Sequence, residues 1–302
     1  SITYVKEFLI KRFSRVWPVY VIASLALVFV VRYGIDYLNN LANVKALVYS
    51  LVFFPPTGAN SPPVFGFPVL PVGWTLSYEM YFYVIFGLSM LFGRARWIAF
   101  FAWLGLTLLL IPYLHGVVTL ATTTNYGFEY LYLNLITSPI IWLFAVGVVI
   151  GLIYKSNIQI RTTKTLYFLI FTSVSLVIWQ YLARFKTGHG ISEWGLTLIP
   201  MMLILMLASK KINLSMPAWT VFLGDISFSL YLWHPFVQEY LQKIMMEMGY
   251  GNIAKGFSFL YLTTVISIIF AAASYKILEC GLSEKIKSLL LNKNKQLINC
   301  IL

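Results

Sequence analysis

The sequence predicts an all-α protein: a polytopic membrane helix bundle with about eight transmembrane helices plus one short re-entrant or interfacial helix. Three observations support this prediction. Hydrophobic residues make up 60% of the 302-residue chain and charged residues only 11%, whereas about a quarter of the residues in soluble globular domains are charged. The mean hydropathy is +0.81. Apolar runs of roughly 20 residues, the helical length that crosses a hydrocarbon core, recur along the chain.

Eight apolar segments are predicted to span the membrane. In chain order they are residues 17–34, 74–92, 97–114, 131–154, 165–183, 194–208, 217–237 and 257–278. Because the bilayer core holds no water, backbone groups inside it must bond to one another, so a spanning segment is a helix or a barrel strand. The alternation of apolar and polar residues that barrel strands require is absent here. Each segment is therefore predicted to be a helix.

The connection between the first two spans is predicted to contain a helix that does not cross. Residues 44–54 are apolar but cover about half of a crossing, and nine prolines and glycines follow between residues 55 and 73. We expect a re-entrant or interfacial helix followed by an ordered outer loop. Such a loop could cover an outer cavity or be a plain connector, and the sequence leaves both readings open.

Positive charges are divided unequally between the two sides of the predicted bundle. Of the 22 lysines and arginines, 16 fall on the side of both chain ends and 6 on the other side. The six are Arg32, Lys45, Arg184, Lys186, Lys243 and Lys255. Because Lys and Arg are enriched in cytoplasmic loops, both ends are predicted to be cytoplasmic. The net charge of +12 is spread over short connections, so the predicted partners include membrane lipids but no nucleic acid.

Arg12 and Arg15 precede the first span and form the first candidate binding site. They lie three positions apart and so share a helix face. Two guanidinium groups there could hold a phosphate or pyrophosphate bidentately, and a soluble acyl-CoA or nucleotide would suit them. The alternative is a positively charged anchor that contacts lipid phosphates at the inner membrane surface.

Glu79 is the second candidate, about one and a half turns inside a span that starts at the outer face. A carboxylate at that depth is costly unless it is paired, protonated or facing a wet cavity, so a functional role is the first hypothesis. The alternative is a protonated acid that makes a packing hydrogen bond between helices.

His234 is the third candidate, near the outer end of the seventh span and at a depth similar to that of Glu79. The two side chains could meet, and an imidazole near a carboxylate can serve in proton transfer. The alternative is a histidine that only packs within an aromatic helix. The predicted layout, with arginines at the inner face and Glu79 and His234 toward the outer face, suits transfer of a group across the bilayer.

Three motifs, in this order, resemble the acyltransferase-3 family of membrane-bound bacterial acyltransferases. They are R-x-x-R at residues 12–15, W-[ST]-L-x-x-E at residues 74–79 and S-[FY]-S-L-Y-L-W-H-P at residues 227–235. Residues 68–80 are especially similar to the exopolysaccharide-production branch of that family. The resemblance covers residues 8–284, so we expect a single domain of this kind over residues 1–302.

The resemblance implies an O-acyltransferase in the bacterial inner membrane. Such an enzyme moves an acyl group, commonly acetyl, from cytoplasmic acyl-CoA to a sugar hydroxyl of a lipid-linked or exported polysaccharide. Arg12 and Arg15 would bind the phosphates of acyl-CoA, while Glu79 and His234 would be the catalytic residues that line or polarise the transfer site. Its expected partners are acyl-CoA, the sugar acceptor and lipids, with no tightly bound cofactor and no metal.

Two departures from the family pattern leave other functions open. Family members usually begin with two further spans, one of which carries the histidine that acts as general base, and the chain is expected to lack that segment. Near the other end, an acidic residue followed by a basic residue and proline is replaced by Glu279-Cys280-Gly281, so Glu279 is not predicted to be catalytic. The alternatives are a polysaccharide-precursor transporter or flippase and a truncated, non-catalytic membrane subunit.

Overall fold

A computed structural model of the chain describes residues 2–55, 60–212, 215–252, 254 and 256–291. Helices dominate this part of the chain, and the strands in it are the two-residue pair β1 (Asn60–Ser61) and β2 (Val64–Phe65). The all-α prediction is therefore confirmed. Residues 56–59 of the predicted outer loop, and Lys255, lie outside the described residues.

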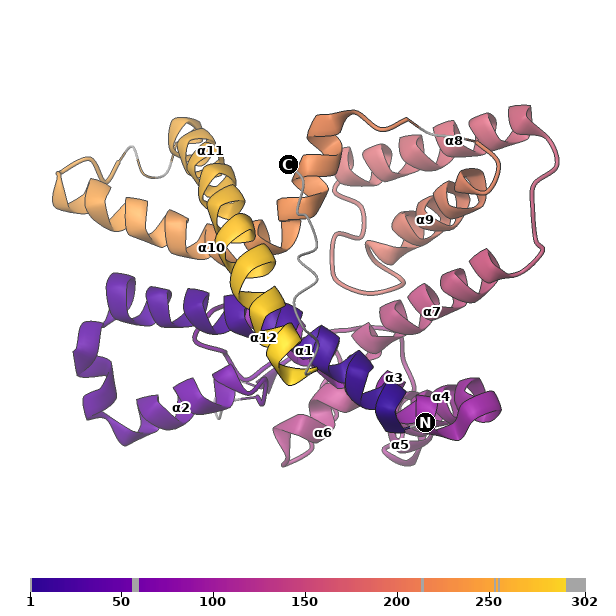
Figure 1. The fold of residues 1–302 in the computed structure, drawn as a ribbon, viewed down its shortest axis with the longest axis horizontal. Helices are drawn as coiled ribbons and strands as arrows, with labels where there is room; N and C mark the ends of the chain where they lie inside the picture. The colour runs from indigo at the N-terminus through magenta and orange to yellow at the C-terminus, as the bar shows by residue number, and fades with distance from the viewer. Residues whose placement is uncertain (1, 56–59, 213–214, 253, 255, 292–302) are drawn as a thin grey trace. The chain divides into compact units, whose positions relative to one another are not determined.

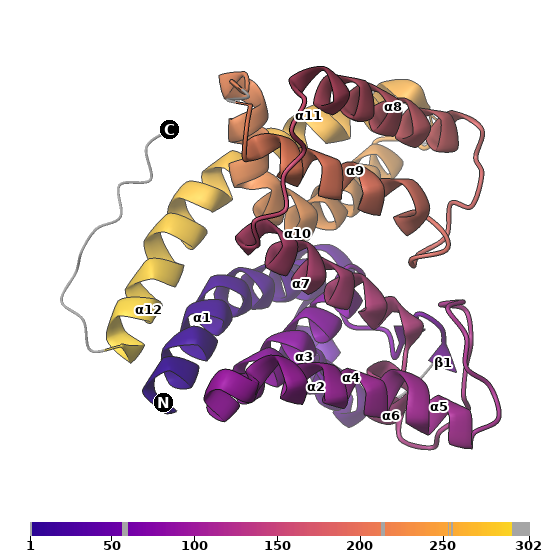
Figure 2. The same cartoon turned by 90° about the vertical axis from the view of Figure 1, so that its right-hand side faces the viewer.

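The chain divides into two compact units, of which the first comprises residues 1–59, 65–99 and 217–302. Its helical elements are α1 (Ile2–Ala26), η1 (Leu27–Arg32), η2 (Gly34–Asn39), α2 (Leu41–Leu51), α3 (Gly73–Ser89), η3 (Met90–Ala95), α10 (Ala218–Glu247), α11 (Phe257–Ser274), η7 (Tyr275–Ser283) and α12 (Glu284–Leu290). Within this unit α12 lies alongside α1 in both views (Figures 1 and 2). Helix α4 (Arg96–Gly105) begins in the first unit and ends in the second.

The second unit comprises residues 60–64 and 100–216. Its further helical elements are η4 (Leu106–Leu110), α5 (Ile111–Leu114), α6 (Leu131–Ile136), η5 (Pro139–Ile141), α7 (Trp142–Lys155), α8 (Thr163–Leu182) and α9 (Gly195–Ser209). The buried amide of Gln180 donates to the carbonyl oxygens of Lys186, at 2.9 Å, and Glu193, at 3.0 Å. Since a buried amide must be hydrogen-bonded, these contacts hold the loop between α8 and α9 against α8.

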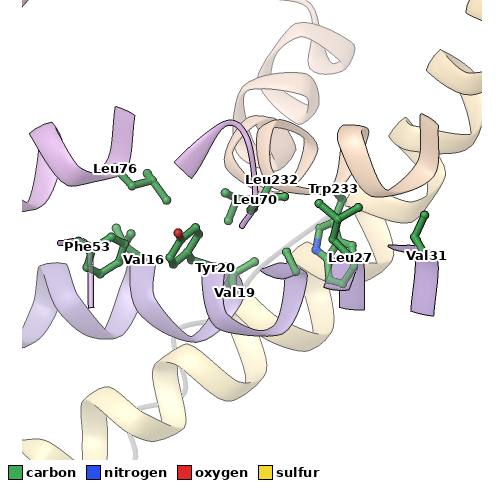
Figure 3. Close-up of a cluster of buried hydrophobic side chains, with 11 residues drawn as sticks. Val16, Val19, Tyr20, Leu27, Val31, Phe53, Leu70, Leu76, Leu232 and Trp233 are labelled. Atoms are coloured by element: carbon green, nitrogen blue, oxygen red, sulfur yellow. The ribbon is translucent and has the colours of Figure 1, made fainter. Parts of the chain in front are cut away.

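The core of the first unit lies between α1, α3 and α10 (Figure 3). Tyr20 from α1 is fully buried and stacks on Phe53, with ring centroids 5.0 Å apart. Its hydroxyl lies 2.8 Å from the hydroxyl of Ser50 at the end of α2, which satisfies both buried oxygens. Leu232 and Trp233 bring α10 into the same cluster. Burial of these apolar side chains thus fixes α1, the helix that bears the two candidate arginines.

Five described segments are long and apolar enough to cross a membrane. They are Ile2–Arg32, Pro71–Leu114, Leu131–Lys155, Thr163–Leu182 and Phe257–Leu290. The predicted helices of membrane-crossing length and composition are therefore present, while the count of eight crossings stays a prediction. Helix α2 has 11 residues and is too short to cross, as predicted for this region, although its start and end lie about three residues earlier than expected. Its re-entrant or interfacial position, and the single domain over residues 1–302, also stay predictions.

Candidate functional site

Arg12 and Arg15 line one cavity of about 490 Å³ in the first unit. Both belong to α1, where their spacing of three places them on one face, as the sequence predicts. Lys11 and Lys287 line the same cavity. Four cationic and three acidic side chains line this space, so its lining carries a net positive charge of one, which permits an anionic ligand.

Arg12 is held by aromatic rings. Its guanidinium carbon lies 5.5 Å from the ring centroid of Phe8 on α1 and 5.2 Å from that of Tyr83 on α3. A guanidinium over a ring face within about 6 Å is attracted by the negative face of the ring. Because both rings belong to packed helices, the position of this charge at the cavity is set before any ligand binds.

Glu79 is linked to Arg12 through Tyr83. The Tyr83 hydroxyl donates to the Glu79 carboxylate over 2.5 Å, one turn earlier on α3. Helices α1 and α3 run antiparallel, since Phe8 contacts Phe86 whereas Gly73 lies against Tyr20. The same tyrosine therefore contacts Arg12 and Glu79, and the predicted separation of these two residues to opposite faces of the bilayer is wrong. The error arose because the first span was taken to begin at residue 17, whereas α1 is helical from Ile2.

His234 lies half-buried in α10, with Nδ1 3.2 Å from the carbonyl oxygen of Leu230. A proton on Nδ1 would be donated to that carbonyl, which would leave Nε2 free of a proton and able to accept one. The neighbouring Tyr231 hydroxyl lies 2.6 Å from the Thr75 hydroxyl and donates to the carbonyl oxygen of Val72 over 2.9 Å. Tyr231 thereby joins α10 to the first turn of α3.

Glu79 and His234 each lie about one helical turn from the contact between Thr75 and Tyr231. Glu79 follows Thr75 by four positions and His234 follows Tyr231 by three, spacings that place residues on the same helix face. Among the described residues no hydrogen bond or ion pair joins Glu79 to His234 directly. The fold therefore brings the two helices together near these residues, and neither of the two residues lines the cavity around Arg12 and Arg15. Their catalytic roles stay predictions.

Glu279, which the sequence did not favour, does line that cavity together with the arginines. Its carboxylate accepts a hydrogen bond of 2.6 Å from the hydroxyl of Ser229 on α10. Ser229 lies 3.1 Å from Ser274, which in turn accepts from the Trp233 indole over 2.8 Å. This buried network holds Glu279 at the cavity wall. The sequence signal was an acidic residue near the end of an apolar span, which was set aside because its neighbours departed from the family pattern.

The π-helical geometry of η7 explains how one short element contributes several cavity residues. A π-helix forms i→i+5 hydrogen bonds, so side chains four to five positions apart share a face. Tyr275, Glu279, Ser283 and Lys287 follow that spacing and all line the cavity, the last from the first turn of α12. Asp225 from α10 and Glu284 add further carboxylates.

The described residues contain no group of three or more histidine, cysteine or carboxylate side chains placed to hold a metal ion. The site as described consists of cations, carboxylates and hydroxyls around one cavity, with Glu79 and Tyr83 behind Arg12. Such an arrangement can bind a phosphorylated ligand through charge-assisted hydrogen bonds.

Comparisons with known proteins identify the family to which the chain belongs. A family model described as an acyltransferase domain matches residues 3–272. The exopolysaccharide production protein ExoZ of Rhizobium meliloti (strain 1021) is 28% identical over 281 residues, which cover 90% of this chain and 80% of ExoZ. The "Putative acetyltransferase ORF330" of Acidianus two-tailed virus is 25% identical over 250 residues, which cover 81% and 69%. No solved structure matches significantly. Since the family model covers most of its length, the chain belongs to the acyltransferase-3 family.

Proposed function

We propose that the protein is a membrane-bound O-acyltransferase that uses cytoplasmic acyl-CoA, in particular acetyl-CoA, as donor. The proposed acceptor is a sugar hydroxyl of an extracytoplasmic or lipid-linked polysaccharide, and the proposed location is the bacterial inner membrane with both chain ends in the cytoplasm. Membership of the family supports acyl transfer. The name of ExoZ concerns exopolysaccharide production, and this supports a sugar acceptor.

The observation that supports the donor most strongly is the cavity lined by Arg12 and Arg15. Coenzyme A is polyanionic, and guanidinium groups form paired, charge-assisted hydrogen bonds with phosphate oxygens. Stacking on Phe8 and Tyr83 holds Arg12 in place, so less side-chain freedom is lost when a phosphate binds. A lipid phosphate anchor would require no cavity of this size.

The proposed reaction breaks the thioester C–S bond of the donor and forms an ester C–O bond to the sugar. The sugar hydroxyl loses its proton to a base, and the departing sulfur of coenzyme A takes up a proton. We assign Glu79 and His234 to the surroundings of the reacting hydroxyl. Nε2 of His234 would accept a proton in the tautomer that donates Nδ1–H to Leu230. The Glu79 carboxylate would orient the hydroxyl or stabilise the imidazolium.

The experiment that tests this function is label transfer in membranes that contain the complete protein. Labelled acetyl-CoA and the exported glycan should give labelled glycan, and Arg12→Ala, Arg15→Ala and Glu79→Gln should each abolish the transfer. Arg94→Ala, an exposed arginine outside the cavity, is the matched control and should retain activity. Full activity in the three site variants would overturn the site assignment. Mass spectrometry of the glycan with and without the gene should show the loss of acetyl groups.

A further inference from the structure

The C-terminal wall of the cavity contains a hydroxyl group with no hydrogen-bond partner. Ser283 is only 5% exposed, and its Oγ has no partner among the described residues. Buried hydroxyls are nearly always hydrogen-bonded, because burial without a partner loses the bonds that water would make. Ser283 lines the cavity, so a ligand there could supply the missing acceptor.

Lys287 follows Ser283 by four positions and lines the same cavity. These two residues and Arg12 come from opposite ends of the chain, but the side-by-side placement of α12 and α1 (Figure 2) brings them to one space. Both Ser283 and Lys287 lie beyond residues 3–272, the part that the family model matches.

The two lysines of the cavity are paired with carboxylates on their own helices. Lys11 lies 3.1 Å from Glu7, and Lys287 forms an ion pair with Glu284. Ion pairs one helical turn apart at a partly exposed position are weak. Each lysine can therefore exchange its carboxylate for a more highly charged partner. A phosphate group, with a charge of about −2 and three acceptor oxygens, is such a partner.

We propose that Ser283, Lys287 and Lys11 bind phosphate groups of the donor in addition to those held by Arg12 and Arg15. This inference rests on the proposed function, because it takes acyl-CoA as the ligand. Coenzyme A carries a diphosphate and a separate phosphomonoester, so one pair of arginines leaves phosphate charge without a partner. Ser283 donates its hydroxyl to a phosphate oxygen, and Lys287 moves from Glu284 to the same group. The donor therefore contacts both α1 and the C-terminal elements η7 and α12.

The test is the dissociation constant of coenzyme A for the full chain, purified in lipid nanodiscs and measured by calorimetry. Lys287→Ala should weaken binding about tenfold, a loss of about 1.4 kcal/mol. Ser283→Ala should weaken it about threefold and should not lower the unfolding temperature, because it removes a hydroxyl that has no partner. Lys285→Ala, an exposed lysine of the same helix outside the cavity, is the matched control and should leave binding unchanged.

A further variant gives an effect of opposite sign. Glu284→Gln removes the carboxylate that competes for Lys287, so it should tighten coenzyme A binding about threefold. Unchanged binding in Lys287→Ala, Ser283→Ala and Glu284→Gln, together with loss of binding in Arg12→Ala, would overturn this inference and leave the proposed function intact. No binding of coenzyme A by the unaltered chain would overturn the proposed donor, and with it this inference.

Discussion

Tyr83 is the residue whose contacts explain most about the candidate site. Its ring lies under the Arg12 guanidinium, and its hydroxyl donates to Glu79. The ring thus contacts Arg12, a candidate residue for binding the donor, while the hydroxyl bonds to Glu79, a candidate catalytic residue. The two roles can be separated by substitution, because phenylalanine retains the ring and loses only the hydroxyl.

Tyr83→Phe should therefore lower kcat about tenfold and leave the KM for acetyl-CoA unchanged, since one charge-assisted hydrogen bond is worth about 1.5 kcal/mol or more. Tyr83→Leu removes the ring as well and should also raise that KM. Initial rates of label transfer at varied acetyl-CoA concentrations give both constants. Tyr4→Phe, at a tyrosine that is 68% exposed, serves as control. An unchanged kcat in Tyr83→Phe would show that its bond to Glu79 has no part in the reaction.

At the residue scale the sequence identified charged candidates but not their connections. Glu79 and Arg12 were found because charge is rare in and beside apolar segments, and that signal is local. The Tyr83 link could have been suspected, because tyrosine four positions after a glutamate lies on the same helix face. Glu279 could not be ranked from sequence, because its place beside the arginines depends on how α1, α10 and η7 pack. Packing of this kind has no signature in a single chain.

The element that positions Glu79 is α3, and its start is set by a close approach to α1. A Cβ added at Gly73 would lie 2.7 Å from the Cε2 ring carbon and 2.7 Å from the hydroxyl oxygen of Tyr20. Tyr20 is fully buried and bonded to Ser50, so its ring cannot move without breaking the core. Glycine is thus required at the first residue of α3 by the space available.

Gly73→Ala should destabilise the protein by about 1–3 kcal/mol, the usual cost of overpacking a core. It should also impair acyl transfer, because the shift moves the helix that bears Glu79. Thermal unfolding in detergent and label transfer measure the two effects. Gly147→Ala is the matched control, because a Cβ there meets no described atom within 4 Å and alanine favours the helix. Equal unfolding temperatures for the two variants would contradict this account of the contact between α1 and α3.

Helical elements were predictable from hydropathy, and their ends were not. Each of the eight predicted spans overlaps one or more described helices, since burial of apolar residues and backbone bonding both favour helices there. The largest difference is α1, which begins 15 residues before the predicted start of the first span. The basic residues 6–15 were read as a helical stretch that precedes the first span. They are continuous with that span in α1, because their charges lie at the cavity or on the exposed side, where helix formation costs no burial of charge.

At the scale of the whole molecule, the open question is how five apolar segments relate to eight crossings. Pro71–Leu114 contains 44 residues, about twice the length needed to cross. It is interrupted at Gly93, whose φ of +56° favours glycine and breaks the helical backbone. Two predicted spans therefore lie within this one segment. The remaining two correspond to α9, which has 15 residues, and α10, which has 30.

Whether α9 and α10 cross can be tested, because an even number of crossings returns the chain to its starting side and an odd number does not. Helix α9 measures about 22 Å at 1.5 Å per residue, and a bilayer can thin locally to accept it. Helix α10 is longer than the hydrocarbon core but contains charged residues such as Asp225 and Glu239. If both helices cross, the connection between them is cytoplasmic and both connections that flank the pair are on the outside.

Fusions to alkaline phosphatase decide this, because that enzyme requires disulfides that form in the oxidising periplasm. Fusions at residues 189 and 250 should be active, and a fusion at residue 211 should be inactive. A fusion at residue 156, between α7 and α8, is predicted to be cytoplasmic and serves as the inactive control. Equal activity at residues 211 and 250 would show that α10 does not cross, and equal activity at residues 189 and 211 would show the same for α9. If only one of these two results is found, the number of crossings is odd. The two chain ends then lie on opposite sides of the membrane, and the prediction that both are cytoplasmic is wrong.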